Sequence, residues 1–200
     1  MHELEQLGRL IVSQRKEWGE ILSGFETRNK YIVFDDAGRE VYLAFEEGGS
    51  LLIRWWLRAL RPFEIVLLTP DRQPVLRIHR PFRFYFHQVQ VRDAAGRPLG
   101  TIRRRFSVLR RRYDVLDDQG RVVYELFGPL VHPWTFEIRR DEDVFGRITK
   151  RWSGLGKEVF TDADNFGVEW PEDWPVTIKA LLLGAVFLID FVHFENTGND

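Results

Sequence analysis

Arginine alternates with tryptophan and phenylalanine in several short segments of this 200-residue chain. Around Trp55 and Trp56, the arginines at 54, 58 and 61 have the spacing of one face of a short helix. Aromatic rings lie at the headgroup level of a bilayer and guanidinium groups bind lipid phosphate, so this composition is typical of a membrane-interface surface. The candidate lipid-binding residues are Arg54, Trp55, Trp56, Arg58, Arg61, Phe82, Arg83, Phe84, Arg103, Arg105, Arg110, Arg111, Arg112, Trp134 and Trp152.

Two other roles fit the same side chains. Trp55, Trp56 and Phe84 would equally serve to close one end of a barrel. Single-stranded nucleic acid is also bound through cationic and stacking side chains, but the chain contains no recognisable nucleic-acid-binding motif. We therefore expect an anionic phospholipid membrane surface as the partner rather than nucleic acid, and the sequence does not identify a protein partner.

The charges of the chain are segregated although the net charge is only −1. The segment from Arg72 to Arg112 holds twelve arginines against one acid, Asp93, whereas Asp162 to Asp200 holds eight acids against Lys179. A band that basic creates a local positive field that attracts phosphate groups. The alternative is a solvated face of a barrel.

Other site classes are excluded by what the sequence lacks. Without cysteine there is no disulfide, thiolate nucleophile, iron–sulfur cluster or palmitoylation site. The histidines His79, His87, His132 and His193 stand singly, and neither a G-x-S-x-G nor a P-loop motif occurs, so we expect no enzyme. The mixed charge of the first 22 residues differs from a secretory signal, which favours a cytoplasmic, peripherally membrane-associated protein.

The elements that must position these residues form a series of β-hairpins. Turns rich in aspartate and glycine recur between segments of strand-forming composition, because Asp bonds its own backbone and Gly accepts positive φ. The turns are at 35–38, 70–73, 93–96, 117–120 and 141–146. They give ten strands, and 157–160 and 166–169 add two more. Such a meander closes into a barrel, with these turns at one end and the arginine-rich connections at the other.

Two segments are predicted to be helical. Residues 4–22 place apolar side chains at near-helical spacing, which indicates a helix on the outside of the barrel. Residues 175–194 are apolar on every side, but only ten residues without charge separate Lys179 from Asp190, too few to span a bilayer. We therefore predict a central helix in the barrel, with these two charges emerging at its two ends. The predicted organisation is an N-terminal helical segment at 1–24, a barrel domain at 25–195 and a tail at 196–200.

Particular segments resemble a known family in their order along the chain. These are Gly24-Phe25-Glu26-Thr27, Asn29-Lys30-Tyr31, Arg61-Pro62-Phe63, Arg80-Pro81, Gly128-Pro129, Phe160-Thr161-Asp162-Ala163-Asp164-Asn165-Phe166-Gly167 and Gly184-Ala185-Val186-Phe187-Leu188-Ile189-Asp190-Phe191. Over nearly its whole length the chain resembles the phospholipid scramblase family, as a cysteine-free member of bacterial type. The resemblance implies the tubby-like fold, a closed antiparallel β-barrel of about twelve strands around a central hydrophobic C-terminal α-helix.

The resemblance also implies Ca²⁺-stimulated, ATP-independent movement of phospholipids between leaflets, and a calcium site within 162–173. Counted as a twelve-residue loop, these residues echo the EF-hand order, but Phe166 at position 5 lacks a side-chain oxygen and Asp173 is shorter than the usual glutamate. Weak Ca²⁺ binding is therefore expected, with an ordinary acidic turn capping the central helix as the alternative. The candidate metal ligands are Asp162, Asp164, Phe166, Val168 and Asp173.

The chain departs from eukaryotic members of the family, which carry cysteine-rich, lipidated stretches near the places where this sequence has Trp, Phe, Leu and Arg. We expect these side chains to replace the acyl chains and to give reversible, anionic-lipid-dependent attachment. A helix that fills a barrel offers no hydrophilic groove for headgroups. The competing function is therefore a peripheral anionic-lipid-binding or protein-interaction module without transport activity.

Overall fold

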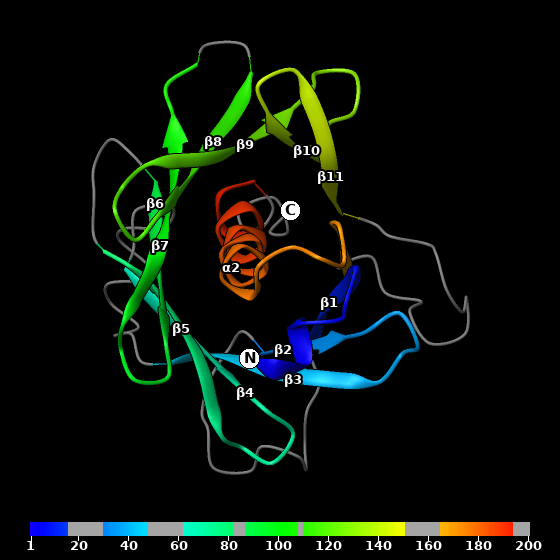
Figure 1. The fold of residues 1–200 in the computed structure, drawn as a ribbon, viewed down its shortest axis with the longest axis vertical. Coiled ribbons are helices and arrows are strands. Elements are labelled where there is room, and N and C mark those ends of the chain that lie inside the picture. Colours follow the sequence, from blue (N-terminus) through cyan, green and yellow to red (C-terminus); the bar gives the residue numbers. More distant parts are fainter. Residues whose placement is uncertain (16–29, 48–61, 82–86, 108–109, 151–164, 194–200) are drawn as a thin grey trace, which may run out of the picture.

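The computed structural model describes residues 1–15, 30–47, 62–81, 87–107, 110–150 and 165–193, and these form a closed antiparallel barrel around one helix (Figure 1). The predicted tubby-like architecture is confirmed. The strands are β1 (Arg9–Arg15), β2 (Lys30–Phe34), β3 (Glu40–Glu47), β4 (Phe63–Leu68), β5 (Pro74–Arg80), β6 (Gln88–Asp93), β7 (Pro98–Arg105), β8 (Arg111–Asp117), β9 (Val122–Gly128), β10 (Thr135–Arg140), β11 (Asp143–Lys150) and β12 (Asn165–Glu169). A short 3₁₀ helix η1 (His2–Leu4) precedes them, and α2 (Val176–His193) follows them.

Each strand pairs with its neighbours in the sequence, and β1 pairs with β12 to close the barrel. Four of the predicted turns connect paired strands as expected, whereas the turn predicted at 141–146 is limited to 141–142 because β11 begins at Asp143. At the β2–β3 turn, Asp35 Oδ1 accepts hydrogen bonds from the backbone N–H groups of Ala37 (2.9 Å) and Arg39 (2.8 Å), while Gly38 has φ +77°. Asp35 and Gly38 thus meet the two requirements of this turn, a carboxylate that accepts hydrogen bonds from the backbone and a residue with positive φ. The β6–β7 and β8–β9 turns repeat the arrangement.

The helix α2 lies inside the barrel, as predicted, and its residues from 179 to 191 are buried. Its length and composition would suit a membrane span, but the barrel already covers most of its surface. Close packing requires Gly184, where a Cβ atom would lie 2.6 Å from Val91 Cγ2. The central helix is therefore the core of the fold.

The two charges of α2 do not emerge at the ends of the barrel, contrary to the prediction, because polar partners allow both to be buried. Lys179 Nζ donates hydrogen bonds to three backbone carbonyls, those of Leu4 (2.9 Å), Glu5 (2.9 Å) and Glu172 (2.7 Å). Asp190 accepts a hydrogen bond from the Tyr31 hydroxyl (3.0 Å) and lies 3.6 Å from Lys150 Nζ. A buried charge is stable only with such partners.

The predicted N-terminal helix is wrong where the structure describes it. Residues 9–15 form strand β1, and Leu10, Ile11 and Val12 are all buried. The otherwise unpaired edges of β2 and β12 override the helical spacing, because pairing with β1 closes the barrel and satisfies both edges. The N-terminal segment is thus part of the barrel. Residues 16–24 and the predicted strand at 157–160 lie outside the described residues.

The connections alternate between two ends of the barrel. We call the end with the five hairpin turns the turn end, and the other, where β5, β7, β9 and β11 finish, the loop end. The helix enters at the turn end, where η1 contacts it, and finishes at the loop end with His193. Side chains at the loop end therefore come from both the barrel wall and the helix terminus.

Candidate functional site

The structure describes six of the fifteen predicted lipid-binding residues. Arg103, Arg105, Arg110, Arg111, Arg112 and Trp134 are described. Arg54, Trp55, Trp56, Arg58, Arg61, Phe82, Arg83, Phe84 and Trp152 lie outside the described residues.

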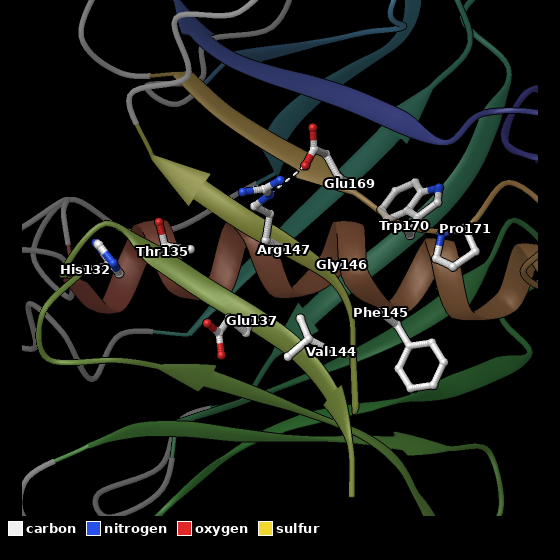
Figure 2. A pocket seen from close by; sticks show the side chains of 10 residues that line it. All are labelled: His132, Thr135, Glu137, Val144, Phe145, Gly146, Arg147, Glu169, Trp170 and Pro171. Carbon is white, nitrogen blue, oxygen red and sulfur yellow. Dashed lines mark hydrogen bonds and ion pairs between the residues drawn. The ribbon is translucent and has the colours of Figure 1, made fainter. Parts of the chain in front are cut away.

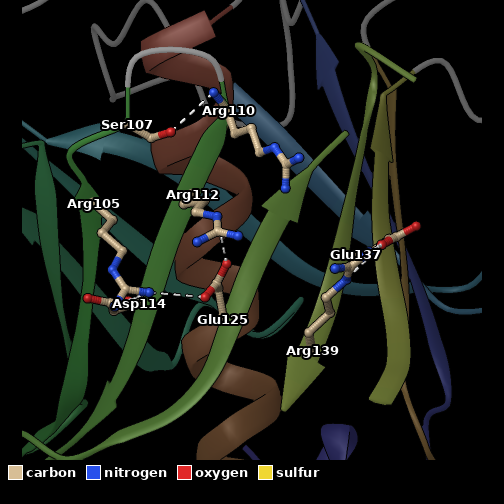
Figure 3. Close-up of polar contacts among 8 residues, drawn as sticks. All are labelled: Arg105, Ser107, Arg110, Arg112, Asp114, Glu125, Glu137 and Arg139. Carbon is tan, nitrogen blue, oxygen red and sulfur yellow. Dashed lines mark hydrogen bonds and ion pairs between the residues drawn. The ribbon is translucent and has the colours of Figure 1, made fainter. Parts of the chain in front are cut away.

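Three of the described arginines lie on the outer wall and are paired with acids, and Figure 3 shows two of them, Arg105 and Arg112. Arg103 lies 3.3 Å from Asp114, and both Arg105 and Arg112 lie 3.2 Å from Glu125. Exposed pairs of this kind contribute about 0–1 kcal/mol each, and they compensate the positive charge. The basic band of the sequence is therefore partly neutralised by acids on β8 and β9 that follow it in the chain.

Arg110 and Arg111 have no carboxylate partner within the described part of the chain. Arg110 is exposed, and its guanidinium lies 5.4 Å from the centre of the Phe127 ring. Arg111 donates hydrogen bonds to the backbone carbonyls of Pro129, His132 and Pro133 and lies over the Phe136 ring. These contacts satisfy hydrogen-bond donors of Arg111 but do not compensate its positive charge.

Exposed apolar side chains gather at the same end. Phe106 is 80% exposed, Leu130 67%, Val131 80% and Trp134 39%. We call these four residues the loop-end patch; they lie in the β7–β8 and β9–β10 connections. Only Trp134 was predicted as a site residue. Phe106, Leu130 and Val131 could have been suspected because they lie beside Pro129, Pro133 or the arginines in the sequence. Their exposure, however, cannot be read from the sequence.

Just inside the loop end, polar side chains meet the terminus of α2. A hydrogen bond of 2.7 Å joins the Tyr113 hydroxyl to His193 Nε2, and Arg80 bonds His87 Nδ1. Burial, with Arg80 and Arg104 nearby, lowers the pKa of His87 to about 4. Burial and the charges of Arg104 and Arg111 lower the pKa of His193 to about 3. Both histidines are therefore neutral at pH 7.

The predicted calcium loop is not formed as an EF-hand by its described residues. Phe166 and Val168 lie in β12 with buried side chains, and β12 is paired on both sides. A five-residue strand separates its ends by roughly 13 Å, whereas Ca²⁺ ligands lie 2.3–2.6 Å from the ion. Asp173 lies beyond the turn end of β12, so the described residues of the twelve-residue loop do not surround one point.

Asp162 and Asp164 lie outside the described residues, so these two ligands remain a prediction. Within the described ranges, no cluster of three or more histidine, aspartate or glutamate side chains has the arrangement of a metal site.

A cavity of about 810 Å³ lies on the outer wall over β10, β11 and β12 (Figure 2). It runs from His132 near the loop end to Phe145 and Pro171 near the turn end. Its charged residues are already engaged, since Arg147 Nε donates to Glu169 (2.7 Å). The cavity therefore offers no unpaired charged group that would extend the candidate site at the loop end.

Comparisons with known proteins agree on one family. The family model described as Scramblase matches residues 1–196. Phospholipid scramblase 1 of Mus musculus is 35% identical over 98% of this chain, which spans 64% of that protein's length. Phospholipid scramblase 2 of Bos taurus is 33% identical over 97% of this chain and 71% of its own length. The X-ray structure of a protein from Arabidopsis thaliana matches 94% of this chain and 96% of its own, with a TM-score of 0.55 and 12% identity, a likeness of fold alone.

Proposed function

The chain belongs to the phospholipid scramblase family, and on that premise we propose that it attaches to anionic phospholipid membranes by the loop end and moves phospholipids between leaflets without ATP. Attachment is peripheral and from the cytoplasmic side. The observation that carries the proposal is the coincidence of the loop-end patch with arginines that no described carboxylate neutralises, Arg104, Arg110 and Arg111.

The size of the patch suits reversible attachment. Covering the exposed parts of its four side chains with hydrocarbon contributes about 5 kcal/mol, taking about 1.5–3 kcal/mol for each fully buried side chain. This is near the marginal affinity of one myristoyl chain, about 10⁴ M⁻¹. Each arginine close to an anionic surface adds about 1 kcal/mol. Apolar side chains and arginine thus supply together the two signals that stable anchoring needs.

The finer part of the proposal is a response to Ca²⁺. Support comes from the family premise and from the acidic residues Asp162 and Asp164, which precede β12 in the sequence. Weak Ca²⁺ binding there would add positive charge beside an anionic membrane. Asp173 takes no part in this proposal.

A second candidate function is a lipid-binding module without transport. The observation that favours it is the packed interior, where α2 occupies the centre of the barrel and residues 180–189 are buried. Headgroups then find no polar path along the helix inside the described barrel.

Reconstitution separates the two candidates. The protein is added to liposomes that carry a fluorescent lipid, with and without Ca²⁺, and an impermeant quencher reports label that reaches the outer leaflet. We expect more label to become accessible than in empty vesicles. Unchanged accessibility together with sedimentation of the protein on the vesicles supports the binding module, and absence of both contradicts the proposal.

A pair of matched variants locates the attachment. Changing Phe106 and Val131 together to serine removes two members of the loop-end patch. Changing Val122 and Val144 to serine removes two exposed side chains near the turn end, where they are 56% and 55% exposed. We expect the first variant to lose most of its sedimentation with anionic vesicles and the second to retain it.

A further inference from the structure

Arg104 is an inward-facing cation without a partner in the described part of the chain. It lies two residues beyond Ile102, whose side chain is fully buried in the core, so alternation along β7 directs Arg104 to the inner face. Its side chain is half-buried and makes neither a hydrogen bond nor an ion pair with any described residue. Its backbone is fixed, because its N–H donates to the His87 carbonyl at 2.8 Å. A partly desolvated guanidinium normally has such a partner.

The groups around Arg104 add positive charge rather than compensate it. Arg104 pairs in register with Tyr113 on β8, and Arg111 lies two residues before Tyr113 on the same face. The positive charges of Arg104 and Arg111 both act on His193, whose pKa they lower together with burial. His87 is held neutral by burial and by Arg80 and Arg104.

None of the described acids pairs with Arg104 or Arg111, although Glu46 is buried near the loop end of β3. Asp190 is bound by Tyr31 and Lys150, on β2 and β11, and Asp114 pairs with Arg103 on the outer wall. The C-terminus of α2 contributes only about half an elementary negative charge. Arg104 and Arg111 therefore carry two positive charges that no described carboxylate pairs with.

We propose that the loop-end mouth of the barrel binds one phosphate group, held by Arg104 and Arg111 beside the C-terminus of α2. Guanidinium groups bind phosphate oxygens through short, charge-assisted hydrogen bonds. Arg111 is already oriented by three backbone carbonyls, which limits the entropy that binding costs. The Tyr113 hydroxyl, which is hydrogen-bonded to neutral His193, lies on the same inner face as the two arginines.

The phosphate can come from a phospholipid headgroup or from a free phosphate ion, which present the same oxygens. The headgroup source rests on the proposed function. In that case Phe106, two residues after Arg104, enters the acyl region while the arginine reaches the phosphate at headgroup level. The site would then select phospholipid by its phosphate rather than by its acyl chains.

The test compares Arg104→Gln with Arg97→Gln, which removes the same charge from the turn end, where Arg97 pairs with Asp93. Thermal unfolding is measured in inorganic phosphate and in chloride of equal ionic strength at neutral pH. For the wild type and Arg97→Gln, we expect a rise in Tm of about 3–5 °C at a phosphate concentration of ten times Kd. Arg104→Gln should show no rise.

The unfolding temperature in chloride alone distinguishes a binding residue from a structural one. Because Arg104 faces like charges, Arg104→Gln should unfold at the same or a higher temperature than the wild type in chloride. A lower Tm in chloride combined with an unchanged phosphate response would make Arg104 structural and overturn the proposal. Arg104→Lys, which keeps the charge, should retain part of the phosphate response, and a complete loss with retained folding would count against a charge-based site.

Vesicles of phosphatidylcholine with phosphatidylserine identify the source of the phosphate. Loss of about tenfold in vesicle affinity for Arg104→Gln but not for Arg97→Gln assigns the site to the headgroup. Unchanged vesicle affinity with a lost phosphate response assigns it to free phosphate. A wild type that responds to phosphate but ignores vesicles refutes the proposed function and leaves the site standing. A wild type without any phosphate response, whose vesicle affinity is unchanged by Arg104→Gln, refutes the site.

Discussion

Mild acid should destabilise the barrel through His193 at the end of α2. The imidazole is bonded to Tyr113 and packs against the Phe136 ring at 5.7 Å between ring centres. Burial, followed by the charges of Arg104 and Arg111, lowers its pKa to about 3 from an ordinary value of 6.5. Below pH 6.5 the unfolded chain binds a proton at this histidine and the folded protein does not.

The direction and size of the effect follow from this difference. A histidine with a depressed pKa in the folded state contributes stability that is present above pH 6.5 and is lost as the pH falls toward the folded value. Between pH 7 and pH 5 the full shift corresponds to about 2 kcal/mol, and partial exposure of the ring reduces this to about 1–2 kcal/mol. Carboxylates as a class are mostly ionised between pH 5 and pH 7, so protonation of histidine accounts for most of the change in the free energy of unfolding.

Urea unfolding at pH 7 and pH 5, in a buffer without phosphate, measures the loss of folding free energy between the two pH values. The variant His193→Gln keeps a group that can bond Tyr113 but cannot be protonated, so it should lose about 1–2 kcal/mol less than the wild type between the two pH values. His132→Gln, in the exposed β9–β10 connection, is the control and should behave like the wild type. If His193→Gln retains the full pH dependence of the wild type, the reasoning is refuted.

Three further predictions concern the interior and the acidic segment. Lys179→Met should lower the free energy of unfolding by about 2–5 kcal/mol in urea titrations, because one buried and two partly buried backbone carbonyls lose their donor. An unchanged midpoint would contradict this. Gly184→Leu should lower the free energy of unfolding by about 1–3 kcal/mol, because the new side chain overpacks against Val91. Adding Val91→Ala should restore part of that free energy. Equal unfolding midpoints for the single and double variants would disprove the contact. Asp173→Asn should leave any Ca²⁺ response in the liposome assay unchanged, whereas Asp164→Asn should weaken it, and the reverse order would restore the twelve-residue loop.

The hairpins were predictable because their determinants are local. Asp35 and Gly38 are three residues apart, and together they define the β2–β3 turn. The helix α2 was predictable from its apolar run and the spacing of its charges. By contrast, Leu10, Ile11 and Val12 fit helix and strand equally, and only the closing pairs with β2 and β12 decide between the two.

The site was predictable in composition but not in its details. The pairing of Arg105 with Glu125 depends on two strand registers, and Lys179 bonds Leu4, 175 positions away in the chain. Neither contact can be predicted from the spacing of residues in the sequence. Sequence therefore identified the basic and aromatic end of the barrel, but not which arginines are neutralised there or that Val131 is exposed.

The absence of cysteine allows the membrane face to be tested directly with single labels. An environment-sensitive fluorophore on Val131→Cys reports the loop end, and the same fluorophore on Val144→Cys reports the turn end. When anionic vesicles are added, we predict a blue shift and quenching by a bilayer-embedded quencher for the label at 131 alone. Insertion of the label at 144 instead, or equal responses from both, would contradict the assignment of the loop end as the membrane-binding face.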